Sequence, residues 1–274
     1  MTIASKLQTL AAIKAAQYEA IIAKGGTLSP GDWSAYAAAI AALPTGGGIP
    51  AIISSMPFEI GDEPLTGTIW YVKPGGTGNQ DGSSWDHAFA TRQEAVNAAS
   101  YGDHIRVWEG QYYLSTVQTP KAGVSEYYGF NGDGSWATRH PFTHPSKLDA
   151  GFTSNTFVND SVTFLDEQII DGMWIQNGRA GNGGGMNLGN KTYLRNGVIL
   201  NNNGSSGGGV YMSSSSTASN CIIANNNSSD GGGVFLSSSS TASNCIIANN
   251  NVSSSGGGVY TNGSSTISNC IIAK

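Results

Sequence analysis

The residues best suited to acid–base chemistry lie in one stretch near the middle of the chain. Four acidic side chains cluster there: Asp160, Asp166, Glu167 and Asp171. Four basic side chains precede them: Arg139, His140, His144 and Lys147. Two carboxylates on opposite sides of a glycosidic bond can cleave it, so a glycosidase pair is one interpretation of this cluster. The other interpretation is a set of solvated loops in which aspartates cap turns.

Metal and phosphate chemistry have weaker support in the sequence. His140 and His144 flank two prolines in a predicted loop and could contribute to a metal site. No third ligand follows at a matching spacing, so we predict no metal site and no cofactor. Residues 75–82 are rich in glycine but lack the Gly-Lys-Ser/Thr ending of a phosphate-binding loop, so we expect a turn there.

The C-terminal half of the chain repeats itself. The pentapeptide Gly-Gly-Gly-Val-Tyr/Phe occurs at residues 207–211, 231–235 and 256–260. The pentapeptide Asn-Cys-Ile-Ile-Ala carries the cysteines, which are Cys221, Cys245 and Cys270. Their spacings of 24 and then 25 residues, with short β-prone runs between Gly, Ser and Asn, predict one turn of a parallel β-solenoid per repeat.

Stacked coils would place equivalent side chains above one another. Alternation along a strand sends Cys221 and Ile223 to one face and Ile222 to the other. We predict that the cysteines lie inside, because a free Cys behaves as a small hydrophobe. Asn220 and its equivalents are expected at turns, since Asn tolerates left-handed backbone.

An aromatic column is the candidate contact surface of the repeats. Its members are Tyr211, Phe235 and Tyr260. The column either points outward, where it could meet a sugar ring or a neighbouring subunit, or stacks inside the solenoid. Both orientations are compatible with the sequence.

The repeats carry few titratable groups. From residue 180 to 273 the charged side chains are Lys191, Arg195 and Asp230. Acid–base catalysis needs titratable groups within reach of one another, so we predict no catalytic residues in the repeats. The net charge of −5 and only 13 Lys and Arg argue against nucleic-acid binding. The sequence contains no run of 18 apolar residues, so we expect no membrane span.

Four segments follow along the chain. Residues 1–43 are expected to form two amphipathic helices, at 3–24 and 29–43, and residues 44–67 a linker. Residues 68–147 are expected to form the N-terminal cap and lead-in of the solenoid, with a capping box at Thr91–Glu94, and residues 148–274 its repeats. The first helix lacks the continuous apolar core of a signal peptide, so we expect assembly in the cytoplasm.

The lead-in also carries motifs of a known superfamily. They are Tyr-Val-Lys-Pro-Gly-Gly at 71–76, Asp-Gly-Ser-Ser-Trp at 81–85 and Gly-Asp-His-Ile-Arg-Val at 102–107. With them, residues 68–274 resemble right-handed parallel β-helix proteins of the pectate-lyase-like superfamily. The repeats resemble those of polymorphic outer-membrane proteins, and residues 1–43 resemble helical N-termini of phage tail and appendage proteins. The resemblance implies a mainly β, right-handed parallel β-helix with coils of about 24 residues and a short N-terminal helical segment.

This resemblance leads us to expect a structural or adhesive component of a phage-type particle, such as a tail spike or fibre. Its shaft would recognise a surface or a host glycan, and residues 1–43 would bind other virion proteins. A homo-oligomer is expected, with a trimer favoured, located in the virion and assembled without a signal peptide. Two alternatives stay open: a polysaccharide lyase or hydrolase with its site in residues 110–180, and a bacterial surface adhesin that needs an export route.

Overall fold

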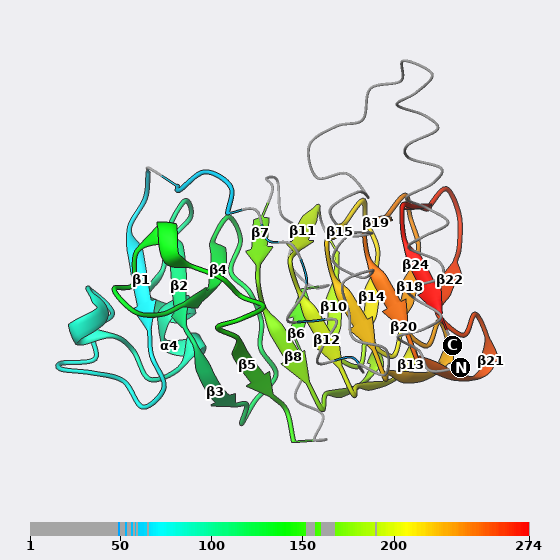
Figure 1. Ribbon diagram of the computed structural model, residues 1–274, viewed down its shortest axis with the longest axis horizontal. Helices are drawn as coiled ribbons and strands as arrows, with labels where there is room; N and C mark the ends of the chain where they lie inside the picture. Colours follow the sequence, from blue (N-terminus) through cyan, green and yellow to red (C-terminus); the bar gives the residue numbers. More distant parts are fainter. Residues whose placement is uncertain are drawn as a thin grey trace, which may run out of the picture.

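The computed structural model describes residues 49, 53, 56, 58, 60–64, 66–151, 157–159, 168–189 and 191–273. Its strands stack in one column from β1 at one end to β22 and β24 at the other (Figure 1). Every strand pair in these residues is parallel. The predicted mainly β, parallel solenoid is therefore confirmed.

Four sheets, here named A to D, run along the column. Sheet A contains β1 (Ile69–Val72), β2 (His104–Trp108), β4 (Ser125–Phe130), β7 (Gln168–Asp171), β11 (Thr192–Arg195), β15 (Thr217–Ser219), β19 (Thr241–Ser243) and β23 (Thr266–Ser268). Sheet B contains β3 (Gly110–Tyr113), β5 (Ser146–Asp149), β8 (Trp174–Gln176), β12 (Val198–Leu200), β16 (Ile222–Ala224), β20 (Ile246–Ala248) and β24 (Ile271–Ala273).

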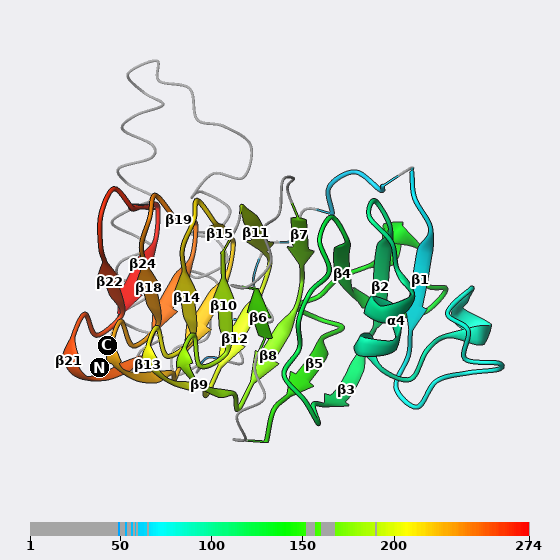
Figure 2. The same ribbon diagram turned by 180° about the vertical axis from the view of Figure 1, so that it is seen from behind.

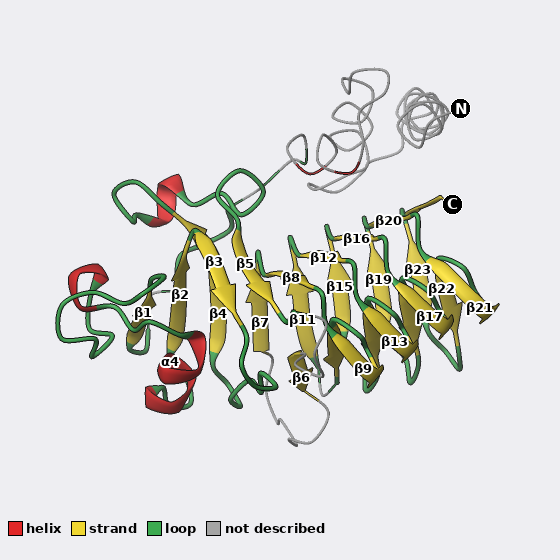
Figure 3. Cartoon of the chain, turned by 90° about the horizontal axis from the view of Figure 1, so that it is seen from below, coloured by secondary structure: helices red, strands yellow, loops and turns green. Residues whose placement is uncertain are grey.

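The two remaining sheets are shorter. Sheet C contains β6 (Phe157–Asn159), β10 (Met186–Leu188), β14 (Val210–Met212), β18 (Val234–Leu236) and β22 (Val259–Thr261). Sheet D contains β9 (Arg179–Asn182), β13 (Asn203–Ser206), β17 (Asn227–Asp230) and β21 (Asn251–Ser255). A regular coil therefore visits sheets A, B, D and C in turn. Figure 3 shows β8, β12, β16 and β20 of sheet B following one another along the column.

The repeat period sets the register between coils. Val210 pairs with Val234, which pairs with Val259, at separations of 24 and 25 residues. Asn220 forms the corner between β15 and β16 in left-handed backbone with φ 56°, as the sequence predicts. Gly231 forms the corner before β18 with φ 63°, and a Cβ there would lie 2.5 Å from the Val234 carbonyl oxygen. A larger residue would therefore be strained at this corner.

The core holds the cysteine column and a buried row of amides. Cys221 and Cys245 are fully buried, so their predicted inward orientation is confirmed, while Cys270 in the last coil is half-buried. The Asn226 Oδ1 accepts hydrogen bonds from the backbone N and the Nδ2 of Asn202, at 2.9 and 3.0 Å. Asn250 Oδ1 accepts the same pair from Asn226 one coil further on. The row satisfies buried polar groups by linking each coil to the next.

One short helix, α4 (Arg92–Ala98), lies beside β1 and β2 at the N-terminal end of the column (Figure 2). The predicted capping box is confirmed: Glu94 N donates to the Thr91 hydroxyl, and Thr91 N donates to the Glu94 carboxylate. Ala95 and Val96 join the core that contains Val72 of β1. Two 3₁₀ turns, η1 (Trp85–His87) and η2 (Trp136–Thr138), lie in the loops around this end.

From β12 onward, sheet B is apolar on its outer face as well as its inner face. Its outward residues include Ile222 and Ala224 of β16, and a second apolar cluster forms there, separate from the core. Ile49, Ile53 and Met56 belong to this cluster. The described residues between 49 and 64 are called the strap below, because they lie along the outside of the solenoid. The predicted helices at 3–24 and 29–43 lie outside the described residues, and within the described part of the chain no helix has the length and apolarity to cross a membrane.

The cysteine column predicts a graded thiol reactivity. A hydrogen bond with a neighbouring thiol, together with burial, raises the pKa of both Cys245 and Cys270, so access to the reagent sets the order of reaction. Cys221 and Cys245 are buried, whereas Cys270 in the last coil is half-buried. We expect Cys270 to react first with a thiol reagent in the native protein, and Cys221 and Cys245 to react only on unfolding. Labelling followed by mass spectrometry, with and without denaturant, measures this order. Rapid native labelling of Cys245 would contradict it.

Candidate functional site

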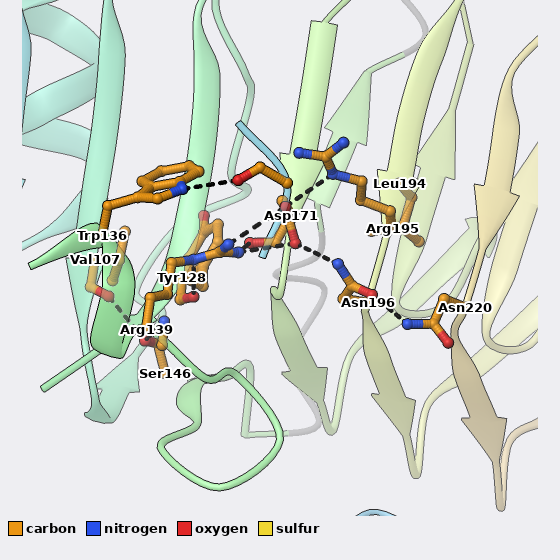
Figure 4. A network of polar contacts seen from close by, with 12 residues as sticks. Val107, Tyr128, Trp136, Arg139, Ser146, Asp171, Leu194, Arg195, Asn196 and Asn220 are labelled. Atoms are coloured by element: carbon orange, nitrogen blue, oxygen red, sulfur yellow. Dashed lines mark hydrogen bonds and ion pairs between the residues drawn. The ribbon is translucent and has the colours of Figure 1, made fainter. Parts of the chain in front are cut away.

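Of the predicted acidic cluster, Asp171 is the member that the structure describes, and it is buried in ion pairs (Figure 4). Its Oδ1 lies 2.8 Å from Arg139 Nη2, and its Oδ2 accepts a 2.8 Å hydrogen bond from Arg195 Nε. Asn196 Nδ2 also donates to Oδ1, at 2.8 Å. Asp160, Asp166 and Glu167 lie outside the described residues.

These contacts make Asp171 a structural tie between coils. Arg139 comes from the loop after β4, and its Nε donates to the Tyr128 carbonyl oxygen at 2.8 Å. Burial lowers the pKa of Arg139, and the charge of Asp171 opposes that shift. With both carboxylate oxygens taken by donors, Asp171 has little capacity left to meet a substrate.

The aromatic column lies on the outer face of sheet C. Val210 and Val234 are fully buried, whereas Tyr211, Phe235 and Tyr260 are partly exposed, so the outward orientation is the one adopted. The ring centroids of Tyr211 and Phe235 lie 5.1 Å apart, and those of Phe235 and Tyr260 lie 4.8 Å apart, in stacked geometry. Both faces of Phe235 are therefore covered by its neighbours. The column offers ring edges to a partner, which favours packing contacts over stacking of a sugar between the rings.

A second surface, on the outer face of sheet B, is hollowed. Gln111, Lys147 and Trp174 lie in register on β3, β5 and β8 and share this face. One hollow of about 430 Å³ is lined by Ile49, Ile53, Phe142, Thr143, Pro145, Lys147, Trp174, Leu200, Asn201 and Asn225. Another of about 350 Å³ is lined by Glu109, Gly110, Gln111, Pro145 and Lys147. The hollows share Pro145 and Lys147 and together are called the sheet B groove.

Lys147 and Trp174 are the central pair of the groove. The Lys147 ammonium lies 4.7 Å from the centroid of the Trp174 ring, a cation–π contact. Among the residues that the structure describes, no carboxylate lies within ion-pairing distance of Lys147. The Trp174 Nε1 is buried and has no hydrogen-bond acceptor in the described part of the chain. A ligand with an acceptor oxygen in the groove could accept a hydrogen bond from the Lys147 ammonium.

Two further polar pairs border the groove. His144 Nδ1 lies 2.8 Å from Glu109 Oε2, and both side chains are partly exposed. Asp149 on β5 accepts hydrogen bonds from Gln176 Nε2 at 2.8 Å and from Asn177 Nδ2 at 2.9 Å. Burial opposes ionisation of Asp149, but these hydrogen bonds outweigh it and hold its pKa below the ordinary value. Asp149 therefore stays ionised and orients neighbouring amides.

Titratable groups elsewhere do not gather into a metal site. Within residues 66–151, 157–159, 168–189 and 191–273, no three His, Cys, Asp or Glu side chains converge closely enough to hold a metal ion. His140 packs its ring against Phe58, with centroids 5.1 Å apart, and burial lowers its pKa. The structure thus places His140 beside the strap and His144 beside Glu109.

The sequence analysis does not single out Trp174 as a candidate functional residue. Lys147 stands out in the sequence by its charge, but Trp174 follows 27 positions later, and the two become neighbours only through strand pairing. A signal was present in the repeat: Trp174 occupies the position that Val198 and Ile222 hold in later coils. An aromatic residue at an otherwise aliphatic outward position marks where the outer face of sheet B changes from aliphatic to mixed aromatic and polar side chains.

Comparison with known proteins found no match to this chain among family models, curated proteins or solved structures.

The buried ion pair predicts a large and specific loss of stability. Asp171→Asn leaves Arg139 buried without its counter-ion, which typically costs about 3–5 kcal/mol. We expect a clearly lower midpoint of urea unfolding, followed by circular dichroism. Asp86→Asn is the matched control, because Asp86 is exposed and the structure gives it no ion pair. Equal stability of the two variants would show that Asp171 does not hold the coils together.

Proposed function

We propose that this protein is a structural and adhesive solenoid of a phage-type particle, and that its sheet B groove recognises a glycan on the target surface. One observation carries the recognition part of the proposal. A tryptophan ring, a lysine without an ion-pair partner among the described residues, and side-chain amides converge in one open groove.

The chemistry of the groove suits a sugar ligand. Trp174, Phe142 and Pro145 supply apolar surface for the carbon-bound hydrogens of a ring, and Asn201 and Asn225 supply amides for hydroxyl groups. Lys147 would donate to an acceptor oxygen. Lys147 and Trp174 stand on strands of a continuous parallel sheet, and Asn201 and Asn225 directly follow strands, so these groups are held more precisely than groups on long loops.

The particle assignment has a different basis. It draws on the resemblance of residues 1–43 to phage appendage N-termini and of residues 68–274 to β-helix proteins. The regular coils support a structural role as a shaft. Each repeat lengthens the solenoid by one turn and adds no cluster of titratable side chains that could carry out catalysis. A trimer remains our expectation for the assembly, and a bacterial surface adhesin would use the same groove in a different location.

A carbohydrate-active enzyme is the second candidate, favoured by one observation. The hydrogen-bonded Glu109 and His144 stand at the edge of the groove, next to Lys147. A carboxylate and an imidazole within reach of a bound glycan could exchange protons with it. Release of reducing ends or unsaturated products from a polysaccharide panel, lost in Glu109→Gln, would favour this candidate over simple binding.

Glycan binding by the groove is tested directly with a glycan array followed by titration calorimetry. We expect Lys147→Ala to weaken binding by about tenfold or more, since a charge-assisted hydrogen bond contributes about 1.5–3 kcal/mol. Trp174→Ala should weaken it to a similar degree, because it removes the aromatic surface on which a sugar ring would pack. Tyr211→Ala, in the aromatic column of sheet C, is the control and should bind normally. Loss of binding in Tyr211→Ala but not in Trp174→Ala would move the site to the column.

A further inference from the structure

Strand β3 forms the edge of sheet B at the N-terminal end of the column. Gly110 N and Leu114 N donate to carbonyl oxygens of the coil that contains β5, at 3.0 and 2.8 Å. A parallel strand bonds to one neighbour at alternate residues, so Gln111 and Tyr113 direct their backbone groups away from β5. Among the residues that the structure describes, neither of these two N–H groups has an acceptor, and no strand follows β3 on this side. The backbone of Gln111 and Tyr113 is called the β3 edge below.

The corresponding edge of sheet A is closed. Beside β1, Tyr71 N donates to the Gly82 carbonyl oxygen at 3.0 Å, and Phe89 N donates to the Tyr71 carbonyl oxygen at 2.9 Å. Pro74 covers only the start of β3, where a Cβ on Gly110 would lie 2.5 Å from the proline Cγ. The first coil thus supplies sheet A with a paired strand and leaves the β3 edge with hydrogen-bonding capacity to spare.

A hollow of about 360 Å³ lies beside the β3 edge. Tyr112 and Leu148, whose side chains are buried in the core, line it together with Gln111 and Tyr113. Tyr113 lies on the outer face of the sheet and is 81% exposed. In an added strand, the residue opposite Tyr112 would therefore meet apolar neighbours, and the residues before and after it would face outward.

The lining of this hollow leaves no charge to be neutralised by a ligand. Its charged member is Arg92, and the Arg92 Nε donates to the buried Glu126 carboxylate at 2.7 Å. The other polar side chains around the hollow are uncharged hydroxyls and amides, from Thr91, Gln93, Gln111, Tyr112, Tyr113, Ser115, Thr116 and Gln118. Uncharged surroundings and spare main-chain groups suit an uncharged peptide better than an ion or a charged sugar.

We propose that the β3 edge binds an extended, uncharged peptide segment of a partner protein, which joins sheet B as one more parallel strand. In this mode main-chain hydrogen bonds supply affinity, and alternate side chains supply specificity. The peptide residue opposite Tyr112 donates its N–H to the Gln111 carbonyl oxygen and accepts from the Tyr113 N–H. A small apolar side chain fits that position, with polar side chains on either side. This site does not depend on glycan binding by the sheet B groove.

Titration of the ¹⁵N-labelled full chain with the peptide acetyl-Thr-Thr-Val-Thr-Thr-amide tests the proposal by nuclear magnetic resonance. We expect the amide signals of Gln111 and Tyr113 to shift as peptide is added, and the hydrogen exchange of both amides to slow. The matched control is the same peptide N-methylated at its valine. It lacks the N–H that donates to the Gln111 carbonyl oxygen and should cause no shift.

Two variants of the protein test the hydrogen bond from the other side. Tyr113→Pro removes the outward N–H and none of the bonds to β5, and proline is tolerated at edge positions of this kind. Tyr113→Ala removes the same ring but keeps the N–H. We expect Tyr113→Pro to bind the peptide at least about fivefold more weakly than Tyr113→Ala, because it leaves a peptide carbonyl group without a donor.

Other results would overturn the proposal. Slow exchange of both amides in the free protein would show that this chain already covers the β3 edge. Exchange that slows as the protein concentration rises would assign the edge to a second copy. Equal binding by Tyr113→Pro and Tyr113→Ala, equal binding of the two peptides, or no shift at Gln111 and Tyr113 would show that the peptide does not add to β3.

Discussion

The structure depends on one constraint, the parallel register that places each residue of a coil directly over its equivalent in the next. Within this register each side chain lies next to the equivalent side chain of the adjacent coil. A residue type that suits one position therefore recurs at the equivalent positions along the column. The buried row of Asn202, Asn226 and Asn250 shows why the constraint is strict: each amide bonds the backbone and side chain of its neighbour. A slip by one residue would bury these polar groups without partners.

The same constraint makes the faces of the solenoid differ. Cys221 and Ile223 fill the core, and Ile222 between them faces outward, so in the regular coils sheet B is apolar on both sides. The outward residues of sheet C need no separate covering element, because each aromatic ring is covered by the ring of the next coil. A repeated outward residue thus either stabilises its own column or requires a covering element, and sheet B meets that need with the strap.

The sequence predicted the features that repetition makes visible and missed those that depend on pairing. The 24-residue period, the left-handed Asn corners and the buried cysteines followed from spacing and residue type alone. Trp174 and Lys147 are neighbours because β5 pairs with β8 across an irregular coil. No local sequence pattern predicts that pairing. The packing of Ile49 and Ile53 on sheet B was also beyond a reading of local sequence, since it joins residues about 150 positions apart.

Chemical variety in this protein lies where the repeat is least regular. In the regular coils any outward position offers a row of similar groups, and Asn, Ser and Thr dominate. Between β3 and β8 the coils differ from one another, and the same outward column changes from Gln111 to Lys147 to Trp174 before it becomes aliphatic. An amide, a cation and an aromatic ring then stand side by side at strand spacing. A site that recognises a particular ligand needs such unlike neighbours, and the register that makes the shaft uniform also fixes their separation.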